Sequence, residues 1–563
     1  MNNRDVEAAR DYHQATKLAY INLANKPPLY KTYSGLPEIP LPSDFNPPGI
    51  PTLDAVSRDA VSGDAVSGDA VSGDAVSGTT DKVPEPVDLA ALAQMLYFSA
   101  GILHKRNLPV AGEVHYRAAA SAGALYPTEV YVVAGEISGL EAGVYHFSPD
   151  RFSLTQLREG DFRRELAAAA GGDDTVAGSP MTLVFTAVFW RSAWKYRVRS
   201  YRYCFWDAGT ILANTLATVR GGASLPARLV TGFVDSEVNA LLGLDSEREG
   251  SLCLAPVGVT GSLGTLRTTG TTEGVTGEPT SQPIASIIPQ SNSDLESEIS
   301  YPEIIQAHAA SSLANRDEVV AWRQAAELSK QEASNEPASE SALTLLQGDN
   351  LTSQALGDAI VRRGSTRRFD RSNISLSQFS AIMDNSTKPL PADFISGQTV
   401  SLLDPYLIVN GVDGLESGSY YFSPVRRRLE LLKKGDFREE AGHLRFEQAL
   451  GADSSAVVYF LADLDRILER YGNRGYRAAQ LEAGVMAGNA YLCAHSLGLG
   501  ATGMTFYDDD VAEFFSPHAL GKSMMFLVAM GKTHEVNRVR PFRSKVAVLL
   551  DSLARGAGQR PGG

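Results

Sequence analysis

The sequence repeats itself at one fixed spacing of 275 residues. "GLEAGVYHFSPDRFSLTQLREGDFRRE" begins at Gly139, and "GLESGSYYFSPVRRRLELLKKGDFREE" begins at Gly414 without any gap between the two copies. The same spacing brings "KYRVRSYRYCFWDAGTILAN" (195–214) onto "RYGNRGYRAAQLEAGVMAGN" (470–489). One offset held over about 75 residues indicates the duplication of a whole domain. We therefore expect two similar domains that pack about a pseudo-two-fold axis within one chain.

Each half shows the same order of expected elements. A helix precedes strands, a buried strand follows, and a long helix rich in small residues leads to a closing strand. The expected helices cover 89–101, 202–220, 375–385 and 477–498, and the expected strands cover 129–135, 181–190, 227–234, 405–411, 455–463 and 523–531. This order indicates an α+β fold in which helices cover a sheet. The small residues Ala483, Gly484, Ala487 and Gly488 would allow close helix packing in a core or at a dimer seam.

Composition divides the chain further. Residues 54–78 are five copies of a DAVSG-like unit, typical of a flexible soluble spacer, and 266–300 are rich in Thr, Gly, Ser and Pro. The expected divisions are an N-terminal extension (1–53), a low-complexity linker (54–84), a first domain (85–265), a linker with one helix (266–354), a second domain (355–540) and a C-terminal tail (541–563).

The charge and the cysteines exclude several classes of protein. A net charge of −14 disfavours non-specific binding to nucleic acid or to anionic membranes. The N-terminal residues lack the apolar core of a signal peptide, and no stretch reaches the roughly 18 apolar residues of a membrane span. We expect a cytoplasmic protein that handles small molecules or peptides. Cys204, Cys253 and Cys493 are far apart and odd in number, so we expect buried thiols, and no Cys/His cluster predicts a metal site.

The segment "VRRGSTRRFD" (361–370) carries candidate anion-binding side chains. Arg363, Ser365 and Arg367 alternate, so in an extended segment two guanidinium groups and a hydroxyl would face one anion. Arginine forks match phosphate well. The alternative is a solvated basic strand that makes surface ion pairs. The first half has no arginine in its corresponding segment "TTDKVPEPVDLAAL".

A second candidate segment lies in the first half only. The small residues of "SAGALYP" (121–127) leave the backbone bare, which would let a flat ligand approach its amides. Moved by 275 positions, this stretch falls on "SGQTVSL" (396–402), which lacks the Leu-Tyr-Pro. Each half therefore lacks what the other half has, and we expect one composite site shared by both.

Together with "WKYR" (194–197) and "GLGATGMTFYDDD" (498–510), these segments resemble the nitroreductase family, in particular SagB-type flavin dehydrogenases in a tandem form. The resemblance covers about 85–265 and 355–535. It implies a mostly antiparallel central sheet flanked by helices in each domain, with FMN bound at the interface of an intramolecular pseudo-dimer. Because the arginine motif occurs once, we expect one FMN per chain. Whether the chain forms higher oligomers stays open.

The resemblance also implies roles for individual residues. Arg363 and Ser365 would bind the FMN phosphate, and Arg367 would lie near the pyrimidine side of the flavin. Lys532 would complete the phosphate site, with Arg538 or Arg540 as alternatives. Two short stretches would lie against the flavin ring: Gly503, Met504 and Thr505 from the second half, and Ser121, Ala122, Gly123, Ala124 and Leu125 from the first.

Lys195 and Tyr196 are the candidate catalytic pair. In SagB-type enzymes a Lys-Tyr pair in this place removes a proton while hydride goes to the flavin N5. A lysine can act as a base when burial or a nearby cation lowers its pKa. The alternative is an interface ion pair beside a packed tyrosine. The second half has Arg470 and Tyr471 at these positions.

Two enzymatic functions and one non-enzymatic function follow from these residues. The first is an FMN-dependent oxidoreductase that dehydrogenates azolines in peptides. The second is a reductase of nitro or quinone compounds that uses NAD(P)H as electron donor. The third is a flavin-free scaffold subunit of a peptide-modifying complex.

Overall fold

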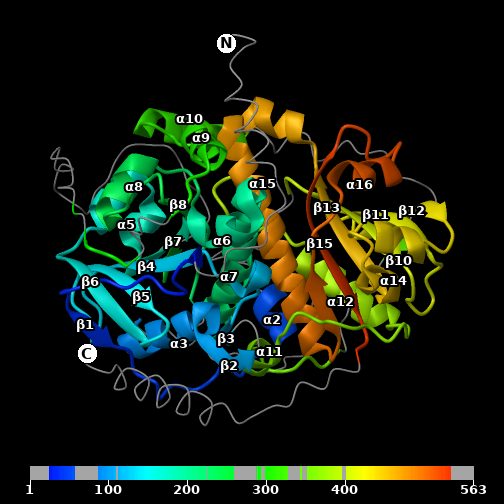
Figure 1. Ribbon diagram of the computed structural model, residues 1–563, viewed down its shortest axis with the longest axis horizontal. Coiled ribbons are helices and arrows are strands. Elements are labelled where there is room, and N and C mark those ends of the chain that lie inside the picture. The colour runs from blue at the N-terminus through cyan, green and yellow to red at the C-terminus, as the bar shows by residue number, and fades with distance from the viewer. Residues whose placement is uncertain are drawn as a thin grey trace, which may run out of the picture.

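The computed structural model describes residues 25–57, 87–108, 112–222, 225–258, 287, 289–292, 298–327, 343–344, 351–395 and 401–533. Two sheets lie on opposite sides of the molecule, with the long helices α7 (Ser200–Gly222) and α15 (Leu464–Ser496) crossing between them (Figure 1). Most of the DAVSG repeat and the whole tail after Thr533 lie outside the described residues.

The first sheet has six antiparallel strands in the order β1-β6-β5-β4-β7-β8. Their bounds are β1 (Glu38–Pro40), β4 (Thr128–Ala134), β5 (Gly143–Ser148), β6 (Ser153–Glu159), β7 (Met181–Val188) and β8 (Glu249–Val257), beside a separate hairpin of β2 (Ile102–Leu108) and β3 (Gly112–Arg117). Every residue of β4 and β7 is buried, because both faces of the sheet are covered. This burial explains why apolar residues occupy adjacent positions in both strands, as in Val130–Ala134.

The second sheet repeats this order. Its seven strands run β14-β15-β13-β10-β11-β12-β9, so β12-β11-β10-β13-β15 corresponds to β6-β5-β4-β7-β8. Their bounds are β9 (Leu343–Thr344), β10 (Asp404–Val409), β11 (Gly418–Ser423), β12 (Arg428–Lys434), β13 (Ala456–Ala462), β14 (Gly500–Gly503) and β15 (Ser523–Gly531). The duplicated α+β fold predicted from the sequence is confirmed.

Helices cover both sheets. In the first half these are α2 (Thr52–Ser57), α3 (Leu89–Ala100), α4 (Arg163–Ala169), α5 (Asp174–Gly178), α6 (Phe189–Tyr196) and α8 (Asp235–Leu242); in the second they are α11 (Leu356–Arg362), α12 (Leu376–Ser386), α13 (Arg438–His443), α14 (Ala449–Asp453) and α16 (Asp508–Phe514). Among the described residues, no helix is long and apolar enough to cross a membrane. All three cysteines are buried and free.

The two halves join along α7 and α15, which pack against each other more extensively than any other pair of elements. A Cβ added to Gly488 would lie 2.5 Å from the Cβ of Ala213, the residue 275 positions earlier. Because this distance is too short for two carbon atoms, the contact needs glycine at 488 opposite the methyl group of Ala213. The small residues of the two long helices therefore form the seam of the pseudo-dimer.

The prediction of a closing strand at 227–234 is wrong. This segment makes only isolated bridges, and β8 (Glu249–Val257) closes the first sheet. The backbone N–H groups of Thr231 and Gly232 donate to the carboxylate of Asp393 at 2.9 and 2.7 Å. Because these donors bond to the second half, they are not available to a strand ladder.

The two linkers contain more structure than the sequence predicts. The single helix expected within the 266–354 linker is two helices, α9 (Pro302–Ala310) and α10 (Arg316–Glu327). The Asn315 side chain accepts the N–H of Glu318 at 3.0 Å, which caps α10 and explains the break. The first residues of the expected spacer, Asp54 to Ser57, belong to α2, where Ala55 is buried against Gly221.

Candidate functional site

Helix α7 holds the small-residue segment of the first half in place. The Asp207 carboxylate accepts hydrogen bonds from Ser121 Oγ at 2.5 Å and from the N–H of Ala122 at 3.0 Å. One turn further along, Thr210 Oγ1 donates to the carbonyl of Ala120 at 2.7 Å. Residues three or four apart share one face of a helix, so α7 presents a row of polar groups to this segment.

The segment turns sharply at Gly123. Residues Ala122–Ala124 form a 3-10 turn in which Gly123 has φ 65°, and Ala124 and Tyr126 also have positive φ, at 54° and 49°. A Cβ on Gly123 would lie 2.7 Å from Tyr196 Oη and 3.0 Å from Lys195 Nζ. Positive φ in residues other than glycine is rare and is concentrated at functional sites. The two distances from Gly123 show that the turn lies directly against the candidate catalytic pair.

Lys195 and Tyr196 end helix α6. The Lys195 Nζ lies 5.1 Å from the centre of the Tyr196 ring. Partial burial and then the charge of Arg367 lower the pKa of Lys195 below its usual 10.5, and burial raises the pKa of Tyr196. At neutral pH the tyrosine keeps its proton, while the lysine loses its proton more readily than a solvated lysine.

Arg363 reaches across the seam to the first half. It follows the last residue of α11, and its Nε donates to the carbonyl of Ala118 at 3.0 Å. Its Nη2 donates to the carbonyl of Arg117 at 3.3 Å. Two of its three guanidinium nitrogens thus attach the 361–370 segment to the end of β3, which leads into the small-residue segment. The third nitrogen, Nη1, takes no part in these bonds.

Tyr491 of α15 connects three predicted positions in the second half. Its Oη lies 3.2 Å from Ser365 Oγ and accepts the N–H of Gly503 at 2.6 Å. The Arg363 guanidinium lies 5.7 Å from the centre of its ring. Tyr491 was not predicted as a site residue, because a tyrosine in a long buried helix carries no distinguishing sequence signal.

Arg367 and Lys532 are both exposed. Lys532 follows β15, and its carbonyl accepts the N–H of Asp370 at 3.1 Å, so it lies beside the end of the arginine motif. The convergence of Arg363, Ser365 and Arg367 on one anion stays a prediction. The alternatives to Lys532, Arg538 and Arg540, lie outside the described residues.

A chain of contacts links the candidate base to the flavin stretch predicted in the second half. The rings of Tyr196 and Tyr203 meet edge to face with 4.7 Å between their centres. Tyr203 Oη in turn lies 3.3 Å from Thr505 Oγ1. The predicted residues of both halves therefore meet at one seam.

The predicted copy of the small-residue segment at 396–402 is in the wrong register. Glu482, at the position equivalent to Asp207, accepts hydrogen bonds from Ser401 Oγ at 2.7 Å and the N–H of Leu402 at 3.0 Å. The counterpart of Ser121 is thus Ser401 rather than Ser396. Ser401 precedes β10 by three positions, whereas Ser121 precedes β4 by seven. The turn around Gly123 is therefore an addition in the first half, which a gapless offset cannot align.

Asp207 and Glu482 are two buried carboxyls beside the candidate site that sequence reasoning missed. Burial raises the pKa of each carboxyl to about 7, and hydrogen bonds from the serine and the backbone oppose this rise. A signal was present in the sequence, because the 275-residue offset places one acidic residue on the other within the two long helices.

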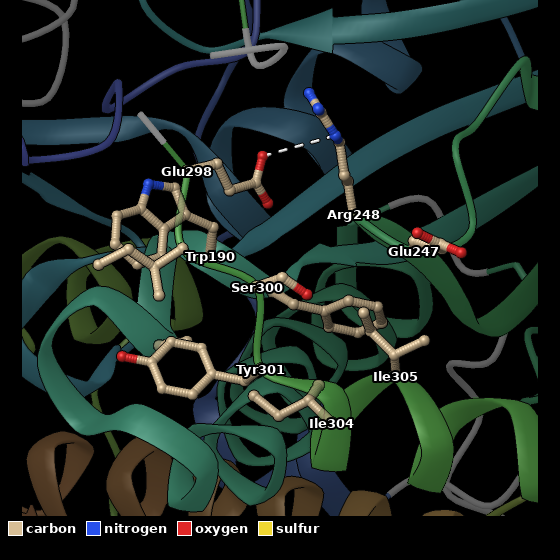
Figure 2. Close-up of a pocket in the computed structure, with 11 residues that line it drawn as sticks. Trp190, Glu247, Arg248, Glu298, Ser300, Tyr301, Ile304 and Ile305 are labelled. Carbon is tan, nitrogen blue, oxygen red and sulfur yellow. Dashed lines mark ion pairs between the residues drawn. The ribbon is translucent and has the colours of Figure 1, made fainter. Parts of the chain in front are cut away.

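A separate pocket of about 210 Å³ opens beside the first turns of α6. Figure 2 shows the Trp190 and Tyr301 rings on one side of it and the ion pair between Arg248 and Glu298, at 3.7 Å, across it. Its lining is Phe189, Trp190, Ala193, Glu247, Arg248, Glu298, Ile299, Ser300, Tyr301, Ile304 and Ile305. None of the predicted site residues lines this pocket.

Comparisons with known proteins agree with this architecture. A family model described as the nitroreductase family matches residues 83–259 and 409–532, more than half of the chain. MJ1384 of Methanocaldococcus jannaschii, whose name places it among the nitroreductases, is 30% identical over 175 residues, which are 31% of this chain and 81% of that protein. The Microcin B17-processing protein McbC of Escherichia coli is 31% identical over 130 residues, 22% of this chain and 47% of McbC.

A crystal structure extends the likeness to nearly the whole chain. A protein of Anabaena variabilis, also named as a nitroreductase, superimposes with a TM-score of 0.66 and 23% identity, covering 93% of this chain and 99% of that one. At this identity the likeness concerns the fold. The fold and the seam thus define a duplicated α+β protein built as a pseudo-dimer. The chain belongs to the nitroreductase family, in a tandem form.

Proposed function

We propose that this chain binds one FMN at the seam and transfers hydride between the flavin and an organic substrate. The observation that carries the proposal is the bond from Arg363 of the second half to the carbonyl of Ala118 in the first. This bond connects the arginine motif to the residues that lead into the small-residue segment, and each of these two motifs is present in one half only. A single ligand bound between the two halves would need one such motif from each half.

The chemistry of the residues fits FMN. Arg363, Ser365, Arg367 and Lys532 offer hydrogen-bond donors and positive charge, and a phosphate offers only acceptors and negative charge. The tight turn at Gly123 and the Gly503 stretch present backbone with little side-chain bulk, as a flat ring needs. When bound, FMN would supply a two-electron acceptor for hydride.

Within this proposal, dehydrogenation of a peptide substrate is favoured. The substrate would lose a hydride to the flavin and a proton to the deprotonated Lys195 Nζ. Dioxygen would then take the two electrons together with two protons and leave as hydrogen peroxide. The lowered pKa of Lys195 supports this role, since a base must be neutral near the working pH. Tyr196 keeps its proton and would donate a hydrogen bond to the substrate. The similarity to McbC, which is named for processing a peptide, supports a peptide substrate.

The second candidate is an NAD(P)H-dependent reductase, which the name of MJ1384 favours. Under anaerobic conditions NADH or NADPH would then bleach the flavin within seconds. Slow bleaching by both nucleotides, with rapid bleaching by an azoline-containing peptide, supports the dehydrogenase instead.

The decisive experiment is the absorption spectrum of the purified chain with its flavin stoichiometry. We expect one FMN per chain, and its loss in the double variant R363A/R367A. The control R164A/R428A removes two exposed arginines outside the seam and should stay yellow. A colourless wild type that takes up no added FMN would leave the flavin-free scaffold as the function. If the R363A/R367A variant stays fully yellow, the FMN phosphate is bound by other residues.

A further inference from the structure

Among the residues that the structure describes, Arg445 is a buried cation without an anionic partner. It follows α13, and its side chain is 0% exposed. Its Nη2 contacts the sulfur of Met504, while Nε and Nη1 have no hydrogen-bond partner in the described part of the chain. The equally buried Arg474 and Arg477 instead share the carboxylate of Asp235, at 2.8 and 2.7 Å. Burying a guanidinium is unfavourable unless its charge is matched, so Arg445 stands apart from these structural arginines.

The side chain keeps its charge at neutral pH. Burial lowers the pKa of Arg445 to about 10, and the neighbouring titratable groups are the hydroxyls of Tyr459 and Tyr491. Burial holds the pKa of Tyr459 above its usual value, so this phenol stays neutral. The positive charge of Arg445 therefore has no negatively charged neighbour within residues 25–533 as far as these are described.

The position of this charge ties it to the seam. Met504 lies between Gly503, whose N–H bonds to Tyr491, and Thr505, which contacts Tyr203 of the first half. The position equivalent to Arg445 in the first half, 275 residues earlier, is Ala170. The charge thus occurs only in the half that also carries the arginine motif.

We infer that Arg445 is a positioning residue that acts through Met504: it holds the 503–505 stretch and makes the site more favourable for a flavin that has gained negative charge on reduction. The inference rests on the proposed function. A buried charge acts strongly at a distance because the surrounding medium is of low permittivity and no solvent screens it. Arg445 should therefore raise the midpoint potential of the bound flavin without touching the phosphate.

The test is the midpoint potential of the flavin-loaded chain, measured by equilibration with a reference dye, together with the Kd for oxidised FMN. In R445M we expect the preference for reduced over oxidised flavin to fall about tenfold, which is a shift of about 30 mV to more negative potential for a two-electron couple. R445K should restore most of the shift. R438M is the matched control, because Arg438 begins the same helix and bonds to the carbonyls of Ala452 and Asn410 instead.

The outcomes separate this inference from the proposed function. A wild type that binds no FMN refutes the proposed function and the inference together. A wild-type potential in folded R445M, or a shift of equal size in R438M, refutes the inference alone. An R445K variant that shifts as far as R445M would also refute it, since charge would not be the cause. R445Q, which keeps a polar side chain without the charge, replaces R445M where the latter does not fold.

Discussion

Gly209 and Gly484 meet backbone to backbone where α7 crosses α15. A Cβ on Gly209 would lie 2.5 Å from the carbonyl carbon of Gly484, and a Cβ on Gly484 would lie 2.8 Å from the carbonyl oxygen of Trp206. The two glycines stand 275 positions apart and are therefore equivalent in the duplication. Equivalent residues touch each other only near a two-fold axis, so the pseudo-two-fold passes through this crossing.

We expect Gly484→Ala to destabilise the chain by about 1–3 kcal/mol, because the added methyl group overlaps backbone that belongs to another helix. Urea denaturation measures the change. Gly178→Ala is the control, since a Cβ there meets nothing within 4 Å. Equal stability of both variants would contradict the close crossing.

Gly123→Ala should impair catalysis more than stability. The new methyl group would press on Tyr196 Oη and Lys195 Nζ, so substrate oxidation should fall at least about tenfold, as expected when catalytic groups are displaced by about 1 Å. Gly172→Ala is a matched control, because Gly172 has φ 77° but no atom within 4 Å of an added Cβ. Similar losses of activity in both variants would attribute the effect to backbone strain alone.

The rate of substrate oxidation should rise with pH as Lys195 loses its proton. Since burial and Arg367 lower the pKa of this lysine, the rise should be centred below 10.5. Arg367→Gln removes the cation and should move the rise to higher pH. Lys195→Arg should lose the rise altogether, because arginine stays protonated throughout. A profile that is unchanged in Lys195→Arg would remove this residue from the mechanism.

Asp207 and Glu482 should make stability depend on pH. Each folded-state pKa, at about 7, lies above the value in the unfolded chain, so the folded state binds more protons between about pH 4 and pH 7. The stability from these groups is full below the unfolded pKa and is lost as pH rises through 7, by at most about 1.4 kcal/mol per pH unit for each carboxyl.

Thermal unfolding at pH 5.5 and pH 8 measures this slope. The double variant D207N/E482Q keeps oxygen acceptors for both serines and should flatten it. The exposed pair Asp174→Asn and Glu439→Gln serves as the control. A slope that persists in D207N/E482Q would show that other groups cause it.

Much of the architecture could be predicted from local pattern. Short segments dominated by apolar residues identified β4, β7, β10 and β13, and small residues at helical spacing identified α7 and α15. These helices and strands could be predicted because they depend on residues close together in the sequence and on burial, which the pattern of hydrophobic residues indicates. The strand predicted at 227–234 failed because Asp393, far away in sequence, binds its N–H groups.

The candidate site, too, could be predicted only in part from the sequence. The 275-residue repeat by itself determined that two homologous domains pair within one chain. The arginine motif and the small-residue segment, each present in one half only, indicated a shared site. Only the tertiary structure decided that Arg363 bonds to Ala118, that Gly123 lies against Tyr196, and that buried Arg445 contacts Met504 and no described carboxylate. These contacts join loops across a helix crossing, and their distances follow from how closely the two glycines let α7 and α15 approach, which no local sequence pattern records.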